Sequence, residues 1–147
     1  MSNTQVQGEV ERWMVENYLP KHYHMKFAKK KLLLFWGGKF EFDAVSENNE
    51  IAGCISTSSA RTATGKAAVG KYHKIKADAF YLNAAVGVAK KFLLFTDDRM
   101  KSYFEKERDN GRFPHDIELL YAPPPAHLRA RLQESADVAS REVSPSK

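Results

Sequence analysis

The sequence predicts an α/β protein with a mixed central sheet of about five strands flanked by helices, in the order α-β-β-β-α-β-α-β-α. Three observations support this fold class. Apolar residues recur at helical spacing in the first segment and in the long segment before the fourth strand, and two further segments are predicted as helices. Five other stretches have the alternation or the β-branched and aromatic composition of strands. The first three strands follow one another, which favours an antiparallel meander, and helices separate the later strands, which favours crossover pairing.

Residues 7–23 are predicted to contain the first helix, and Pro20 is expected to end it. Its apolar side chains lie on one helical stripe. They are Val10, Trp13, Met14 and Tyr18. A first strand over 29–38 is an uninterrupted apolar run after its lysines, so we expect it to be buried on both sides and to end at its glycine pair.

The second strand, 39–46, alternates in side-chain character, and the third strand, 51–58, returns after a polar turn over 46–50. Period two puts three side chains of the second strand on each face. These are Phe40, Phe42 and Ala44 on one face, and Glu41, Asp43 and Val45 on the other.

A segment rich in serine, threonine and glycine then leads into a long helix whose apolar positions recur at steps of three and four. They are Tyr72, Ile75, Ala79, Leu82 and Val86. The remaining elements are expected to be a strand, a helix, a strand and a final helix with proline at its start. Their ranges are 90–98, 98–111, 116–123 and 124–142.

A chain of 147 residues is expected to form one domain over 1–134, with the end of a helix and a frayed tail over 135–147. Cys54 is the only cysteine, so no intrachain disulfide can form, which favours a reducing, cytoplasmic setting. The longest apolar run is far shorter than a membrane span. We therefore expect a soluble chain without a membrane partner.

The formal net charge of +5 favours polyanionic partners. Lysines and arginines gather in residues 20–31 and 61–78, and this composition suits contact with backbone phosphates. The candidate nucleic-acid-binding residues are Lys29, Lys30, Lys31, Arg61, Lys66, Lys71 and Lys74. The alternative is a solvated helix face, on which Lys74 and Asp78 form an i,i+4 pair of little energetic weight.

The hairpin "KFEFDAVSENNEIAGCISTSS" carries the candidate chemistry. Asp43 lies on its second strand, and ten residues separate it from Cys54, which begins the triplet "CIS" ending at Ser56. With the predicted order of elements, this hairpin resembles the PD-(D/E)XK nuclease superfamily, whose core runs helix, three-strand meander, helix and strand. The resemblance spans residues 8–123 and puts Asp43, Cys54 and Ser56 at catalytic positions.

The resemblance implies a magnesium-dependent phosphodiesterase, in which carboxylates hold the cation and a lysine assists at the phosphate. This chain departs from that pattern on the third strand. Cys54 stands where the family has an acid, and a thiol is a soft ligand unsuited to magnesium. Ser56 stands at the lysine position and supplies no positive charge. A lone cysteine in a core strand is typically a small buried apolar residue.

Other residues could replace the missing groups. Glu11 on the first helix and Glu41 on the strand of Asp43 are candidate metal ligands, so the possible metal set is Asp43, Glu11 and Glu41. Lys66, Lys71 or Lys74 on the long helix could replace the missing lysine, since active-site residues of this superfamily migrate there. The glutamates of the first helix could equally form an ordinary solvated face.

Three functions follow as hypotheses. The leading one is a nuclease-fold protein with a degenerate catalytic motif that binds nucleic acid, chiefly DNA, or regulates a DNA-processing assembly, with no cofactor. The alternative is an active nuclease that requires magnesium and uses migrated residues. The third is a protein-interaction domain without a nucleic-acid role. Whether the chain is a homodimer or a subunit of a larger assembly is left open.

Overall fold

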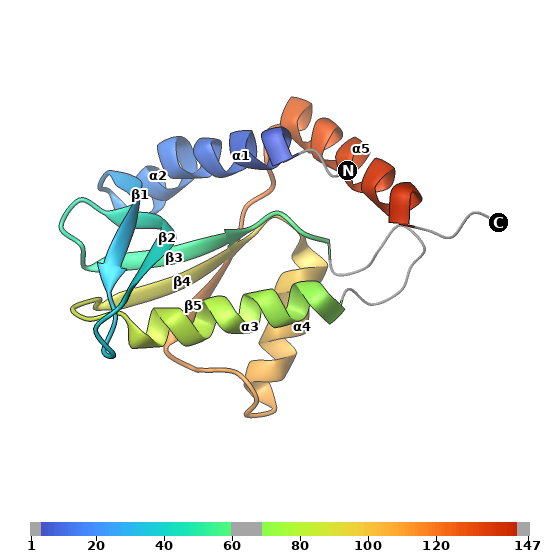
Figure 1. The fold of residues 1–147 in the computed structure, drawn as a ribbon. Coiled ribbons are helices and arrows are strands. Elements are labelled where there is room, and N and C mark those ends of the chain that lie inside the picture. The colour runs from blue at the N-terminus through green and yellow to red at the C-terminus, as the bar shows by residue number, and fades with distance from the viewer. Residues whose placement is uncertain (1–3, 60–68, 144–147) are drawn as a thin grey trace.

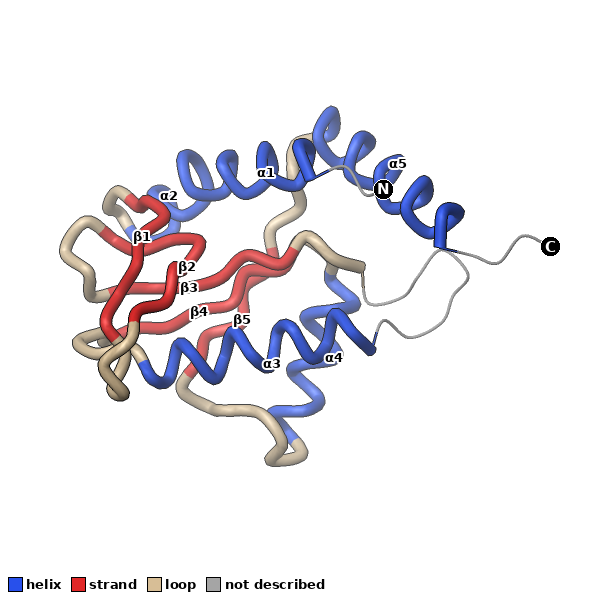
Figure 2. Tube along the Cα trace, in the orientation of Figure 1, coloured by secondary structure: helices blue, strands red, loops and turns tan. Residues whose placement is uncertain are grey.

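Five strands form one mixed sheet with helices packed on both of its faces (Figure 1). The computed structural model describes residues 4–59 and 69–143, with side chains over 5–59 and 69–134. Figure 2 shows the strands as one red layer between blue helices. α1, α2 and α5 cover one face of the sheet, and α3 and α4 cover the other (Figure 1).

The described helices and strands follow the predicted order closely. The helical segments are α1 (Thr4–Trp13), the π-helix η1 (Met14–Tyr18), α2 (Leu19–Tyr23), α3 (Val69–Ala84), α4 (Asp98–Asp109) and α5 (Ala126–Val143). The strands are β1 (Phe27–Leu33), β2 (Lys39–Ser46), β3 (Ile51–Ser56), β4 (Lys90–Phe95) and β5 (Ile117–Tyr121).

The strand order is β1-β2-β3-β4-β5. β2 pairs antiparallel with β1 and β3, whereas β3, β4 and β5 are parallel. β2 therefore runs opposite to the other four strands. The predicted α/β class, the antiparallel meander and the parallel crossovers are confirmed.

Two apolar cores lie on the two faces of the sheet. On one face, Ile75, Ala79 and Leu82 of α3 pack with Met100 and Phe104 of α4 over the sheet. On the other face, the first helical segment and α5 pack over a second set of strand residues. This set includes Ala44, Ile51, Ile55, Phe92, Leu94 and Leu120. Both faces are thus closed, as parallel strands require.

Pro20 does not end the first helical segment, contrary to the prediction. The π-helix Met14–Tyr18 precedes it, and the amide of Leu19 donates to the carbonyl of Met14. Pro20 then occupies the start of α2, where a missing amide removes no intrahelical bond. The helix ends instead at His24, whose φ of 61° is left-handed.

The first strand is shorter and more exposed than predicted. β1 ends at Leu33, and a turn follows in which Gly37 has a φ of 97°. Phe35 and Trp36 in this turn are exposed. The prediction of a strand buried on both sides is wrong, because β1 is an edge strand and an apolar run alone does not distinguish edge from centre.

β2 has the predicted bounds, but its alternation breaks. The pairing register advances two residues on β1, from Ala28 to Lys30, while it moves three residues on β2, from Val45 to Phe42. This β-bulge at Asp43 and Ala44 places Val45 in the core beneath α3 and Ala44 in the core beneath α1. The predicted shared face of Phe42 and Ala44 is therefore wrong.

α3 has the predicted buried stripe, except at its end. Val86 lies beyond Ala84, the last residue of the helix, and is exposed. The predicted binding residues Arg61 and Lys66 and the tail over 144–147 lie outside the described residues. No helix in the described part of the chain is long and apolar enough to cross a bilayer.

The close approach of β3 to β4 requires glycine at position 53. A Cβ on Gly53 would collide with the ring of Phe92, which is fully buried. We expect Gly53→Ala to lower the free energy of unfolding by about 1–3 kcal/mol through overpacking, measured by urea denaturation.

Gly8→Ala in α1 is the matched control. Nothing lies within 4 Å of a Cβ at Gly8, so this change should raise stability by about 0.5–1 kcal/mol through helix propensity. Equal effects of the two substitutions would contradict the close packing of Gly53 on Phe92.

Candidate functional site

Asp43 lies at the bulge of β2, where β2 and β3 separate. Only Ala44–Gly53 and Val45–Ala52 pair between these strands. Beyond these pairs, the carboxylate of Asp43 replaces the backbone ladder: its Oδ2 accepts a hydrogen bond of 2.8 Å from the amide of Ile55. The side chain of Asp43 is half-buried between the diverging strands.

Cys54 lies beside this carboxylate on the α3 side of the sheet, 4% exposed within the core. Burial raises the pKa of its thiol well above the ordinary value, and the charges of Asp78 and Asp43 raise it further. The backbone amide of Asp43 and the charge of Lys74 act in the opposite direction. At neutral pH the thiol is therefore protonated, as expected for a small buried residue.

Ser56 ends β3 and is half-buried. Its carbonyl accepts a hydrogen bond of 3.1 Å from the amide of Thr96. The hydroxyl accepts a bond of 3.4 Å from the amide of Ser58. Ser56 therefore terminates the strand and supplies no charge at the position where the resemblance implies a lysine.

Lys74 and Asp78 lie on α3, on the face of the sheet that α3 and α4 cover. The Nζ of Lys74 lies 3.2 Å from Oδ2 of Asp78. Burial raises the pKa of Asp78, the charge of Asp43 adds to this, and Lys74 opposes it. Burial alone would lower the pKa of Lys74, but the carboxylates of Asp78 and Asp43 outweigh it and raise that pKa. The negative charge of Asp43 thus acts on both members of the Lys74–Asp78 pair.

Glu11 of α1 approaches from the opposite layer. Burial raises its pKa, and the negative charge of Asp43 raises it further. The cations of Lys29 and Lys74 partly offset both effects. Charges from both helical layers therefore meet where β2 and β3 diverge. We call this group the Asp43 cluster: Glu11, Lys29, Asp43, Cys54, Lys74 and Asp78.

Several predicted site residues lie apart from the Asp43 cluster. Glu41 is exposed, and its charge is not among those that shift the pKa of Glu11, Cys54, Lys74 or Asp78. Lys71 is exposed on α3, one turn before Lys74, and Lys31 is exposed on β1.

Lys30 points to the β2–β3 turn. Its Nζ donates to Oδ1 of Asn49 at 2.8 Å and to the carbonyl of Ser46 at 3.3 Å. Alternation along β1 thus separates Lys30 from Lys29, although the two are neighbours in sequence.

Asp78 is the member of the cluster that the sequence interpretation missed. The sequence predicts for Asp78 only an ion pair with Lys74 on a solvated face, yet Asp78 is 8% exposed. A signal was present: Asp78 lies three residues after the core residue Ile75 and directly before the core residue Ala79. A carboxylate at the edge of a buried stripe needs a partner, which makes it a candidate functional group.

The donor set of the cluster fits magnesium poorly. Glu11, Asp43 and Asp78 carry the oxygen ligands that a hard cation prefers. Within the described side chains, however, no three His, Cys, Asp or Glu residues are arranged to hold a metal ion. One oxygen of Asp43 already accepts the amide of Ile55, and the neighbouring ligand position is a buried, protonated thiol.

Comparison of this chain with protein-family models, curated proteins and solved structures gave no match. The sheet topology and the side chains of the Asp43 cluster therefore carry the functional inference.

The bond from Asp43 to Ile55 predicts a structural cost for removing the carboxylate. We expect Asp43→Ala to lower the free energy of unfolding by about 1–3 kcal/mol, because the amide of Ile55 is buried and would lose its partner. Asp43→Asn keeps a carbonyl acceptor and should lose less. Urea denaturation measures both.

The control for this prediction is Glu41→Ala, an exposed acid on the same strand, which should change stability by less than about 0.5 kcal/mol. If Asp43→Ala behaves like Glu41→Ala, the bond to Ile55 has no energetic role.

The raised pKa of Asp78 predicts a pH-dependent effect of Asp78→Asn. Below the ordinary value of 3.8, the carboxyl is protonated in both the folded and the unfolded chain. As the pH rises through the higher folded pKa, the folded state must ionise a buried acid and loses stability. Asp78→Asn removes this loss, so its melting temperature relative to the original chain should increase between pH 3.8 and neutrality.

Asp109→Asn, at an exposed position at the end of α4, is the control and should show no such trend. A melting-temperature difference for Asp78→Asn that is constant with pH, or that reverses, would contradict the assigned shift.

Proposed function

We propose that this chain is a nuclease-fold protein with a degenerate catalytic motif that binds DNA through the surface around the Asp43 cluster. It would act as a binding or regulatory module in DNA processing, in the cytoplasm, without a cofactor. The position of Cys54 carries this proposal. A buried, protonated thiol occupies the place where the family resemblance implies a metal-binding carboxylate.

The order of helices and strands supports the resemblance to the nuclease superfamily. The helix, three-strand meander, helix and strand of the resemblance correspond to α1, β1–β3, α3 and β4. The aspartate of the second strand lies at a bulge and contacts the third strand, which brings the two motif-bearing strands together. Fold likeness alone does not establish activity.

Two cations support nucleic-acid binding. Lys29 is exposed on β1, and the side chain of Lys74 is 70% exposed on α3. Both lower the pKa of Glu11, which the negative charge of Asp43 raises. They could contact phosphates on either side of Asp43, a contact that requires no metal.

An active, magnesium-dependent nuclease is the second candidate. It is favoured by Lys74, because the charge of Asp43 acts on this lysine of the long helix, which could replace the one missing at Ser56. Such an enzyme would use Asp43 with Glu11 and Asp78 as ligands. It requires these carboxylates to converge more closely than they do here.

The binding proposal predicts a specific salt dependence. The full chain should bind labelled DNA in fluorescence anisotropy, with affinity falling steeply as salt rises. Lys29→Ala combined with Lys74→Ala should weaken binding and reduce the slope of log affinity against log salt by about 1 for each lysine that contacts a phosphate.

Lys90→Ala combined with Lys106→Ala removes the same charge from exposed positions on β4 and α4 and is the control. Equal losses in the two double variants would show a diffuse charge effect and reject the site. The absence of salt-sensitive binding would reject the nucleic-acid role altogether.

Incubation with plasmid and single-stranded DNA plus magnesium or manganese separates the two candidate functions. The binding module should cleave neither substrate. Cleavage that Asp43→Asn abolishes would establish the nuclease and overturn the degenerate-site proposal. The asparagine variant keeps the acceptor for Ile55, so its loss of cleavage would not reflect unfolding.

A further inference from the structure

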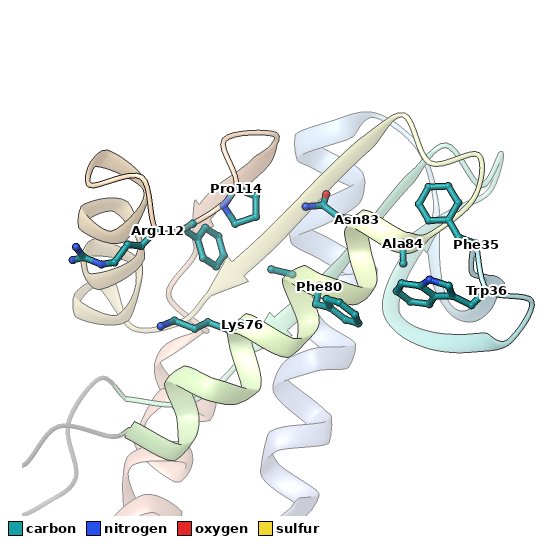
Figure 3. A pocket seen from close by; sticks show the side chains of 10 residues that line it. Phe35, Trp36, Lys76, Phe80, Asn83, Ala84, Arg112 and Pro114 are labelled. Carbon is teal, nitrogen blue, oxygen red and sulfur yellow. The ribbon is translucent and has the colours of Figure 1, made fainter.

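A second surface lies where the β1–β2 hairpin meets the end of α3. Two backbone hydrogen bonds hold the hairpin and the helix end together. The amide of Phe35 donates to the carbonyl of Ala84 at 3.0 Å, and the amide of Val86 donates to the carbonyl of Leu33 at 2.9 Å. The exposed aromatic residues of the hairpin are therefore fixed relative to α3. They line one end of a pocket of about 410 Å³ (Figure 3).

The aromatic end of this pocket is unusually exposed. Phe35 is 71% exposed, Trp36 64% and Phe80 57%. The rings of Trp36 and Phe80 stack, with centroids 5.3 Å apart and planes at 20°. Large apolar side chains gathered at the surface indicate a binding site. A stacked pair held in place offers a ready flat surface for another ring at little entropic cost.

The opposite end of the pocket is cationic. Figure 3 shows Lys76 and Arg112 at the end away from Trp36. Both contact Glu107: Lys76 Nζ lies 3.7 Å from Oε1, and Arg112 Nη2 lies 2.8 Å from Oε2. One carboxylate faces two cations, so this end keeps a net positive charge.

We propose that this pocket binds an unpaired base of single-stranded nucleic acid. The base stacks on the Trp36–Phe80 pair, and a neighbouring phosphate lies against Lys76 and Arg112. Every base has a π face, so such stacking tolerates any sequence. Bases in a duplex already stack on one another, so the pocket selects single strands. This inference rests on the proposed nucleic-acid function and specifies its substrate.

Charge complementarity decides between this occupant and an apolar protein partner or a second copy of the chain. A protein partner that used only the aromatic end would leave one of the two positive charges uncompensated, because Glu107 supplies a single negative charge to both cations. A nucleotide supplies both a flat ring and an anionic group. Pro114 lies between the two ends of the pocket (Figure 3), and the buried Phe113 also lines it, so ring and anion would bind in one pocket.

Fluorescence tests the proposal directly, since the chain has two tryptophans. In Trp13→Phe, Trp36 becomes the only tryptophan. A single-stranded oligothymidylate should quench its emission, and a duplex hairpin of equal length should not. By anisotropy, Trp36→Ala and Phe80→Ala should each weaken binding of the single strand by about five- to 150-fold. Trp36→Phe should keep most of the affinity.

Tyr121→Ala, which removes an exposed aromatic residue of β5, is the matched control and should leave the affinity unchanged. If the oligonucleotide binds with salt sensitivity but neither quenches Trp36 nor responds to Trp36→Ala, the stacking pocket is refuted and the proposed function survives. If no nucleic acid binds, both are refuted. Self-association in sedimentation that Trp36→Ala removes would identify the pocket as an interface between copies and overturn the proposal.

Discussion

The hydrogen bond from the amide of Ile55 to the carboxylate of Asp43 is the constraint on which the site depends. β2 and β3 pair at only two positions, so the buried amide of Ile55 would otherwise lack a partner. The bulge in β2 brings Asp43 into line with this amide. Because a side chain and not a backbone carbonyl closes the gap, an anionic group lies inside the plane of the sheet.

This position exposes Asp43 to both helical layers. Glu11 approaches from α1, and Lys74 and Asp78 approach from α3, so one carboxylate influences the protonation of groups that lie on opposite faces of the sheet. Burial opposes ionisation of Glu11 and Asp78, and Lys29 and Lys74 compensate only in part. Buried acids whose charges are only partly compensated make this cluster a candidate functional site.

The order of elements followed from the sequence because periodicity is a local property. The predictions that were wrong depended on contacts between residues far apart in the sequence. Pro20 stays inside a helical segment because a π turn precedes it. The apolar first strand is an edge because nothing pairs beyond β1 in the described sheet. Asp43 and Lys74 could be proposed from spacing and family resemblance, but only the packing of α3 shows that Asp78 shares their environment.

α3 links the two surfaces. At about 100° per residue, Lys74 and Asp78 lie on one flank of the buried stripe around Ile75, while Lys76 and Phe80 lie on the other. The stripe fixes both flanks to the sheet, so their separation is rigid. The helix itself stands between them, and one nucleotide cannot reach both. If the proposed function holds, the Asp43 cluster and the aromatic pocket would contact different parts of a bound strand, and each would contribute to binding without the other.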